Sequence, residues 1–321
     1  MPKPTTARLA AAVLVAAVLV AAVLVAGCGD DTDTASSATT EARAAARNAA
    51  FPVVVTAENG DVELTAQPQR IVSLSPSLTE LLFAIEAGDQ VVAVDQYSDF
   101  PAGTPVTDLS GFQPNVEAIG GYQPDVVVVA SDRDGVVDAL GGLGIPTLLL
   151  SSADGLDDVY DQIETLGAAT GHADAAGALA DRLRVDLDEI AASVPERDEP
   201  LRYFYELSEG LHSVTSDTFI GEVLGLAGLT SIADGVDDTA GGFPQLSTEY
   251  VLDADPDVVF LAHTDGTGQD PAEVAARPGW SELGAARNGN LVVLDPDISS
   301  RWGPRLVELL RAVVAATSEI D

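Results

Sequence analysis

The 321-residue sequence contains one cysteine, Cys28, one lysine, Lys3, and three histidines, His172, His212 and His263. A single cysteine excludes an internal disulfide bond. A receptor for a bare metal ion needs about three or four His, Asp or Glu ligands that meet at one point. Because the three histidines stand in separate segments, we expect no metal site. Basic residues are also few: 15 Lys and Arg stand against 51 Asp and Glu, for a formal charge of −36. Such a surface repels nucleic acid and anionic lipid, and we exclude both as partners.

The nucleophilic motifs of hydrolases are missing as well. The sequence has no G-x-S-x-G pattern. The glycine pair Gly142-Leu143-Gly144 follows a predicted helix instead of opening one, so it is not a phosphate-binding loop. We therefore predict a protein that is not an enzyme and that has no resident cofactor. Paired α/β lobes also occur in chelatases, so an enzyme that handles tetrapyrroles is the alternative outside the binding class.

The longest apolar run stands at the N-terminus. Lys3 and Arg8 precede residues 9–26, which are all Ala, Val or Leu, and the run leads into Val25-Ala26-Gly27-Cys28. A charged start, an apolar stretch and small residues before a cleavage point are typical of a secretory signal.

The four residues that end this run resemble the lipobox of bacterial lipoproteins, in which the cysteine becomes the acylated N-terminus of the mature chain. The resemblance implies a signal peptide over residues 1–27 and lipidation of Cys28. Removal of Lys3 and Arg8 with the signal lowers the formal charge to about −38. An uncleaved transmembrane anchor is the alternative, because 18 apolar residues can just span a bilayer.

The rest of the chain shows an α/β pattern. Residues 28–52 are rich in Asp, Ser, Thr and Ala without apolar periodicity, and we predict a flexible tether there. Asn59-Gly60 between two alternating apolar runs predicts a β-hairpin. Short apolar strands then alternate with helical stretches, which is typical of parallel sheets covered by helices. The predicted strands are Ile71–Leu74, Val91–Val94, Val126–Ala130, Pro146–Leu150, Arg202–Tyr205, Val258–Ala262 and Leu291–Leu294.

One long helix without a strand partner separates the two sets of strands. It is predicted from about Ala173 to Val194, before Pro195, with apolar residues every three or four positions that form one buried stripe. We predict an α/β fold of two lobes, with mostly parallel sheets, joined by this linker helix. The predicted boundaries are 53–167 for the N-terminal lobe, 168–195 for the linker and 196–321 for the C-terminal lobe.

The two halves repeat a sequence signature. Its parts are a Gly-Phe pair, a glutamate and a Pro-Asp pair that begins a strand: Gly111-Phe112, Glu117 and Pro124-Asp125, and then Gly242-Phe243, Glu249 and Pro256-Asp257. Asn115 and Ser247 are natural N-caps, which places each glutamate at the second position of a short helix. Such a residue complements the helix dipole. A matched pair is also suited to docking, because a twofold-symmetric partner can bind two carboxylates with arginines.

Three segments carry a family resemblance: Gln69–Pro76 with Thr79-Glu80-Leu81, Tyr97–Pro101, and Asn115–Val129. They resemble the periplasmic binding proteins of ABC importers for vitamin B12 and ferric siderophores, over about residues 51–318. The resemblance implies two lobes joined by one rigid helix, a metal-chelate ligand held between them and little closure on binding. It also implies a monomer at the outer face of the cytoplasmic membrane, with an ABC permease dimer and its ATPase subunits as partners. Glu117 and Glu249 would dock onto permease arginines.

The resemblance also suggests ligand contacts. Tyr97, Phe112 and Phe243 match aromatic positions that frame the corrinoid in the vitamin B12 branch, and Asp297 and Arg301 match residues that face the ligand there. Tryptophan is common in that branch where the two phenylalanines stand, so the stacking area is smaller here. Anchoring of the loops is the alternative role for the aromatics, and a salt bridge is the alternative for Arg301.

Charge helps to choose between ligand classes. A ferric catecholate is strongly anionic and needs several converging arginines, whereas only Arg133, Arg301 and Arg305 are candidates. For Arg305 we expect a salt bridge, and for Trp302 either a place beside the ligand or packing under the last helix. A near-neutral corrinoid is therefore the first prediction and a ferric hydroxamate siderophore the second. Catecholate and haem come behind them.

Overall fold

The computed structural model describes residues 51–236, 241–263 and 270–320, all within one compact unit. The predicted signal peptide, Cys28 and the tether up to residue 50 lie outside the described residues. Within the described ranges, no helix combines the length and the apolar character that a membrane span requires.

The N-terminal lobe is built on a five-stranded parallel sheet. Its strands are β3 (Ile71–Ser73), β4 (Val91–Asp95), β5 (Val106–Leu109), β6 (Val126–Val129) and β7 (Thr147–Leu149). They pair in the order β5-β4-β3-β6-β7. All four valines of β6 are buried, as a strand covered on both faces requires. The helices of this lobe are α2 (Pro76–Ala84), α3 (Val116–Gly121), α4 (Val136–Gly142) and α5 (Leu156–Thr170).

A hairpin precedes this sheet and covers one of its edges. β1 (Val53–Ala57) pairs antiparallel with β2 (Gly60–Leu64), which confirms the prediction from the Asn-Gly pair. The Asn59 side chain donates to the carbonyl of Thr147 and accepts from the N–H of Leu149, at 2.9 and 3.0 Å. The turn thus satisfies backbone groups of the edge strand β7, which hinders pairing of that edge with another chain.

The C-terminal lobe repeats the topology with four parallel strands. They are β8 (Leu201–Glu206), β9 (Leu229–Ser231), β10 (Val258–Leu261) and β11 (Leu291–Val293), in the order β11-β10-β8-β9. Read from the edge strand β11, this order matches β7-β6-β3-β4 of the first lobe. Its helices are α7 (Phe219–Leu226), α8 (Thr248–Ala254), α9 (Pro271–Ala275), α10 (Gly284–Asn288), α11 (Pro296–Ser299) and α12 (Leu306–Thr317). The predicted α/β class with parallel sheets is confirmed.

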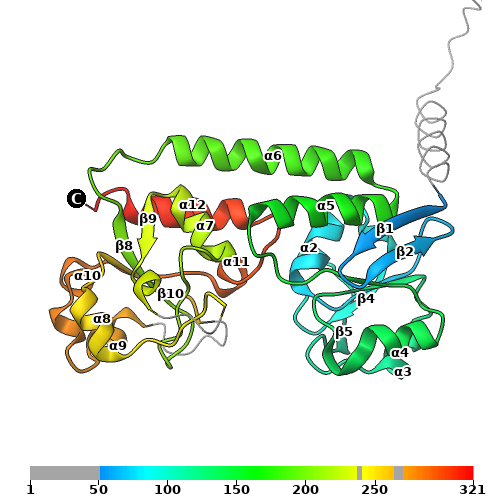
Figure 1. Cartoon of the computed structure of the whole chain (residues 1–321), viewed down its shortest axis with the longest axis horizontal. Coiled ribbons are helices and arrows are strands. Elements are labelled where there is room, and N and C mark those ends of the chain that lie inside the picture. The colour runs from blue at the N-terminus through cyan, green and yellow to red at the C-terminus, as the bar shows by residue number, and fades with distance from the viewer. Residues whose placement is uncertain (1–50, 237–240, 264–269, 321) are drawn as a thin grey trace, which may run out of the picture. The chain divides into compact units, whose positions relative to one another are not determined.

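The linker helix is α6 (Ala173–Ala192), which contacts α5 of one lobe and α12 of the other (Figure 1). Its buried residues follow the predicted spacing: Ala176, Leu179, Ala180, Leu183 and Leu187. Residues 168–170, which the sequence boundaries gave to the linker, belong to α5. That helix ends at Gly171, whose φ of 75° lets the chain turn back into α6.

Two strands were not predicted, and one helix begins later than expected. β5 and β9 are edge strands of four and three residues, and the polar Thr and Asp of β5 and Thr and Ser of β9 hide any apolar pattern. Their extended conformation depends on pairing with β4 and β8. The last helix, which the sequence predicts from Pro304 to Thr317, begins at Leu306.

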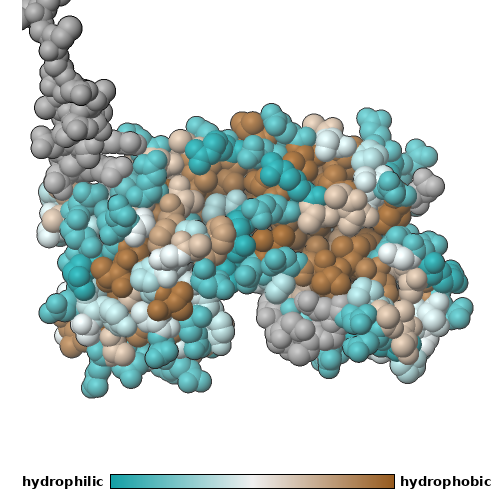
Figure 2. Space-filling model, turned by 180° about the vertical axis from the view of Figure 1, so that it is seen from behind, coloured by the Kyte–Doolittle hydropathy of each residue, from teal (hydrophilic) through white to brown (hydrophobic). Residues whose placement is uncertain are grey.

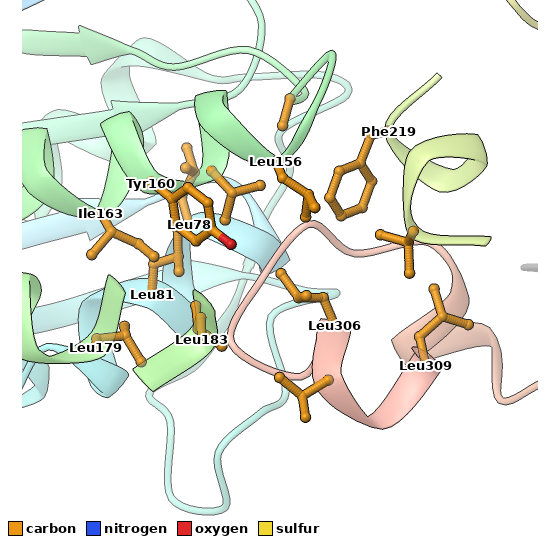
Figure 3. Close-up of a cluster of buried hydrophobic side chains, with 14 of the residues drawn as sticks. Leu78, Leu81, Leu156, Tyr160, Ile163, Leu179, Leu183, Phe219, Leu306 and Leu309 are labelled. Atoms are coloured by element: carbon orange, nitrogen blue, oxygen red, sulfur yellow. The ribbon is translucent and has the colours of Figure 1, made fainter. Parts of the chain in front are cut away.

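The two lobes share one hydrophobic core where they meet. Leu78 of α2, Leu156 of α5, Phe219 of α7, and Leu306 and Leu309 of α12 belong to a single buried cluster (Figure 3). Burial of apolar surface contributes about 25 cal/mol per Å², so separation of the lobes at this junction would cost free energy. Packing therefore holds the lobes together in addition to the chain connections.

Candidate functional site

The residues predicted to bind ligand follow strands at the carboxyl edges of both sheets. Tyr97 comes after β4, Phe112 after β5, and Asp297 and Arg301 after β11, while Phe243 precedes α8. The carboxyl ends of parallel strands share one edge, which is where open α/β sheets bind ligands. The space-filling view shows the surface indented between the two lobes on the side away from α6 (Figure 2).

Tyr97 and Phe112 form an exposed aromatic pair. Their ring centres are 5.8 Å apart at an interplanar angle of 80°, and 50% of Tyr97 and 62% of Phe112 is accessible to solvent. Arg133, in the loop after β6, holds its guanidinium carbon 5.4 Å from the centre of the Phe112 ring. Contiguous exposed apolar surface with a polar rim is typical of a binding site.

Asp95, at the end of β4, holds both aromatic loops in place. Its buried carboxylate accepts from the hydroxyl of Ser98 at 2.7 Å and from the N–H of Tyr97 at 3.2 Å, and also from the N–H of Gly111. Burial raises the pKa of the Asp95 carboxyl, while these hydrogen bonds lower it by less. Gly111 lies so close to the backbone after β3 that a Cβ atom would collide with it. The glycine of the Gly-Phe signature is therefore needed to place Phe112.

Arg301 is bound mainly to protein carboxylates. Its Nη2 donates to Oδ1 of Asp297 at 2.7 Å and to the carbonyl of Tyr97 at 3.2 Å, and its Nη1 donates to Oε1 of Glu80 at 2.9 Å. A weaker bond of 3.3 Å reaches Asp99. The structure thus brings Tyr97, Phe112, Asp297 and Arg301 into one region. Only 11% of the Arg301 side chain is exposed, so little of its charge faces the solvent.

Arg305 forms the expected salt bridge, and its partner comes from the other lobe. Nε and Nη2 donate to Oε2 and Oε1 of Glu80 at 2.9 and 2.6 Å, and this bonding raises the pKa of Arg305. The guanidinium also lies 4.1 Å from the centre of the Phe100 ring. Trp302 packs against the shared core and donates to Gln162 at 2.9 Å.

Glu80 is the residue of this site that sequence reasoning left without a role. It is buried in α2 and neighbours Leu81 and Leu82 along the chain. A carboxylate inside an apolar helix face is rarely buried without a charged partner, so its position was an available signal for a hidden ion pair.

Phe243 occupies the equivalent loop of the C-terminal lobe and is 44% exposed. Gly242 before it has a φ of 92° and lies against Thr218, which leaves no room for a Cβ atom. Within the described part of the chain, Phe243 makes no ring contact with Tyr97 or Phe112. The structure therefore places it apart from the aromatic pair.

Glu117 and Glu249 are exposed at equivalent places in α3 and α8. The predicted N-caps are confirmed: Asn115 Oδ1 and Ser247 Oγ accept from helix N–H groups at 3.0 and 3.1 Å. Each glutamate is the second residue of its helix, as predicted. Both carboxylates therefore project from a capped first turn.

In each lobe, one arginine and one aspartate connect the short helix to the first strand of the parallel sheet. The Arg70 side chain donates to the carbonyl that ends α3, and Asp125 accepts from the N–H of Arg70 at 2.9 Å. In the other lobe, Arg202 donates to the last carbonyl of α8 at 2.8 Å, and Asp257 accepts from the N–H of Arg202 at 2.7 Å. The Pro-Asp signature thus helps to hold the helices that carry the two glutamates.

The three histidines have different surroundings. His263 is buried with Glu206, at 3.0 Å from Nε2 to Oε1, and Arg277 donates to the other Glu206 oxygen at 2.8 Å. His212 lies beside Ser208 in a loop, and His172 is buried just before α6. In residues 51–236, 241–263 and 270–320, no group of three or more His, Cys, Asp or Glu could hold a metal ion.

Comparison with known proteins identifies the family. The family described as periplasmic binding protein matches residues 71–298. The chain belongs to this family. An uncharacterised ABC transporter substrate-binding lipoprotein of Bacillus subtilis is 33% identical to this periplasmic binding protein over 293 residues, 88% of this chain and 89% of the relative.

A cobalamin-binding protein of Halobacterium salinarum is 32% identical over 275 residues, which cover 82% of this chain and 73% of the relative. A solved structure of an ABC-type Fe³⁺-hydroxamate transport system from Saccharomonospora viridis is 26% identical, with a TM-score of 0.66. That match covers 83% of this chain and 99% of the solved one.

Membership of the periplasmic binding protein family sets the general role of the chain. It is an extracytoplasmic substrate-binding component of an ABC transporter, with permease and ATPase subunits as partners and a small molecule as ligand. The family transports and does not catalyse, so the enzyme alternative is not supported.

Proposed function

We propose that this periplasmic binding protein captures a near-neutral corrinoid of the vitamin B12 type and delivers it to an ABC importer. The observation that carries the proposal is the charge balance beside the aromatic pair. Of the three candidate arginines, Arg301 and Arg305 are paired with Glu80, Asp99 and Asp297 and present little net positive charge. This leaves Arg133, beside Phe112, to meet an anionic group of a ligand. A strongly anionic chelate needs unneutralised arginines, whereas a corrinoid uses aromatic and amide contacts.

The relatives support the same ligand class. A cobalamin-binding protein covers most of this chain at 32% identity. A ferric hydroxamate siderophore is the second candidate, because it is also near neutral and the Saccharomonospora viridis structure belongs to a hydroxamate transport system. Haem ranks behind both, since its two propionates favour free cations. We further propose that the chain acts as a monomer on the outer face of the cytoplasmic membrane.

Titration of the purified full chain with cyanocobalamin tests the proposal. Visible absorbance and tryptophan emission are recorded, and a ferric trihydroxamate is titrated in parallel. We expect saturable one-to-one binding of cyanocobalamin that the trihydroxamate does not displace. Saturable binding of the trihydroxamate alone would favour the second candidate, and binding of neither would refute the proposed ligand class.

Truncation of the site aromatics is expected to weaken this binding. Each of Tyr97→Ala, Phe112→Ala and Phe243→Ala should raise the dissociation constant for cyanocobalamin by about fivefold or more, because an aromatic contact contributes about 1 kcal/mol beyond burial. Leu143→Ala is a matched control, since Leu143 is an exposed apolar residue at the end of α4. Unchanged affinity in all three variants, with native circular dichroism, would place the ligand elsewhere.

We also propose that Cys28 carries the lipid anchor. The motivation is the Val25-Ala26-Gly27-Cys28 motif after the apolar run. In cells that process lipoproteins, the unaltered chain is expected in the membrane fraction with residue 28 as its N-terminus. Cys28→Ala should yield uncleaved precursor or released protein. A membrane-bound chain that retains Met1 in both cases would establish the transmembrane anchor instead.

A further inference from the structure

Two glutamates cross the junction between the lobes in opposite directions. Glu80 lies in α2, the helix after the first sheet strand of the N-terminal lobe, and Glu222 lies in α7, the helix after β8 of the C-terminal lobe. Glu80 reaches Arg305, the N-cap residue of α12, in the C-terminal lobe. Glu222 Oε2 accepts from the N–H of Leu156, the first residue of α5, at 2.7 Å.

The glycines that precede α5 and α12 show that the two contacts stand at corresponding positions in the two lobes. Each glycine stands three positions after a Ser-Ser pair. Gly155 follows residues 151–152, and Gly303 follows residues 299–300. A Cβ atom on Gly155 would lie 2.7 Å from Oε2 of Glu222, and one on Gly303 would lie 3.4 Å from Oε2 of Glu80. Each glutamate therefore faces the glycine before the last helix of the other lobe.

The two contacts differ in burial and in charge. The Glu80 side chain is 1% exposed and accepts three hydrogen bonds from Arg301 and Arg305. Loss of its charge would leave two largely buried guanidinium groups without their shared partner. Glu222 is exposed and caps the N-terminus of α5, where the N-cap residue Gly155 has no side chain. A carboxylate at a helix N-terminus is favoured by the unpaired N–H groups and the helix dipole.

We propose that Glu80 and Glu222 form a reciprocal clasp that sets the separation and orientation of the lobes before ligand binds. Separation of the lobes at this junction breaks both contacts, one from each side. The linker α6 adds a third connection through α5 and α12. A joint held in this way presents a preformed cleft and keeps Glu117 and Glu249 at a constant spacing.

Glu80 is also a positioning residue for Arg301, and this part rests on the proposed function. The Glu80 carboxylate accepts from Nη1 of Arg301 on the side of the N-terminal lobe. Nη2 of Arg301 donates to the carbonyl of Tyr97 and to the carboxylate of Asp297. Arg301 is thereby fixed beside the aromatic pair. Without Glu80, Nη1 would lose its buried partner, and the guanidinium would be held only from the side of Tyr97, Asp99 and Asp297.

The clasp is tested by a distance measurement between the lobes. Spin labels are placed at two exposed positions, Asp138→Cys in α4 and Arg287→Cys in α10. The full chain carries Cys28→Ser, so that the introduced thiols are the only ones. We expect a narrow distance distribution that cyanocobalamin leaves unchanged. Glu80→Gln and Glu222→Ala should each broaden it, and the double variant should broaden it further.

Matched controls separate the clasp from a general effect of charge. Glu164 is exposed on α5, so Glu164→Gln and Glu164→Ala are expected to leave the distribution narrow. Glu222→Gln keeps an acceptor oxygen and should therefore keep the distance distribution narrow. Because Glu222→Ala removes one exposed side chain, it tests the clasp even where Glu80 variants fold poorly. The clasp would be overturned if the distance distributions of Glu222→Ala and of any folded double variant superimposed on that of the parent chain.

The ligand readout tests the positioning role separately. Glu80→Gln is expected to weaken cyanocobalamin binding by about tenfold, the usual effect of a lost charge-assisted hydrogen bond. Unchanged affinity would overturn the positioning of Arg301 by Glu80. The distance measurement needs neither ligand nor transporter, so failure of the parent chain to bind cyanocobalamin would count against the proposed function alone.

Discussion

We propose that Glu117 and Glu249 dock onto the permease, and reversal of both, Glu117→Arg together with Glu249→Arg, is expected to lower cobalamin uptake by about a hundredfold or more. Ligand affinity should stay unchanged. Each glutamate would form charge-assisted pairs with permease arginines, and loss of such a pair typically costs about 2 kcal/mol or more when it is partly desolvated. Reversal adds repulsion at both permease subunits. The single changes Glu117→Gln and Glu249→Gln should therefore have smaller effects than the double reversal.

Uptake in cells and ligand titration in vitro measure the two halves of this prediction. Glu164→Arg is the matched control, because Glu164 is exposed on α5. This substitution changes the net charge by the same amount as either single reversal, Glu117→Arg or Glu249→Arg. Folding should hardly change, since an exposed first-turn glutamate contributes a few tenths of a kcal/mol to its helix. Normal uptake by the doubly reversed protein would leave Glu117 and Glu249 as partners of the helix dipole only.

The elements that could be predicted are those whose signals are local. The Asn-Gly turn, the valine run of β6 and the apolar stripe of α6 each contain their own evidence, and all three appear in the structure. β5 and β9 carry no such evidence. They are short edge strands whose residues become extended because a neighbouring strand supplies hydrogen bonds. Pairing of this kind depends on tertiary structure and leaves no periodicity in the sequence.

The site divides in the same way. The repeat places Glu117 and Glu249 correctly on their helices, because N-caps and the Gly-Phe and Pro-Asp pairs are local features. The partner of Arg305 could not be found by such reasoning, because Glu80 stands 225 positions earlier in the chain. That pair forms only when the lobes pack against each other. The roles of Asp95 and Glu222 likewise depend on loops and helices that meet in space.

Glu206→Ala is expected to destabilise the protein more than any other single carboxylate substitution discussed above, apart from changes at Glu80. Glu206 is completely buried, and its two oxygens bond His263 and Arg277. Removal of one partner from a buried charged network typically costs about 3–5 kcal/mol, because the groups that remain stay desolvated and lose that partner. Thermal unfolding should show this loss as a fall in the midpoint of roughly 10 °C.

Two further variants distinguish the loss of stability caused by broken hydrogen bonds from the loss caused by a missing side chain. Glu206→Gln keeps the side-chain volume and one acceptor oxygen, so it is expected to cost less than Glu206→Ala, and Glu164→Ala should change stability by less than about 0.5 kcal/mol. A loss below about 1 kcal/mol in Glu206→Ala would show that His263 and Arg277 find other partners.

Ligand binding should offset part of this loss. Glu206 ends β8 and His263 follows β10, so the network supports the carboxyl edge of the C-terminal sheet without belonging to the aromatic pair. A variant that still folds is therefore expected to bind cyanocobalamin. At a free ligand concentration of a hundred times the dissociation constant, binding adds about 2.7 kcal/mol to the stability of the folded state. A destabilised variant whose midpoint rises with ligand would assign Glu206 to the framework, whereas one that no longer responds would place Glu206 in the binding surface itself.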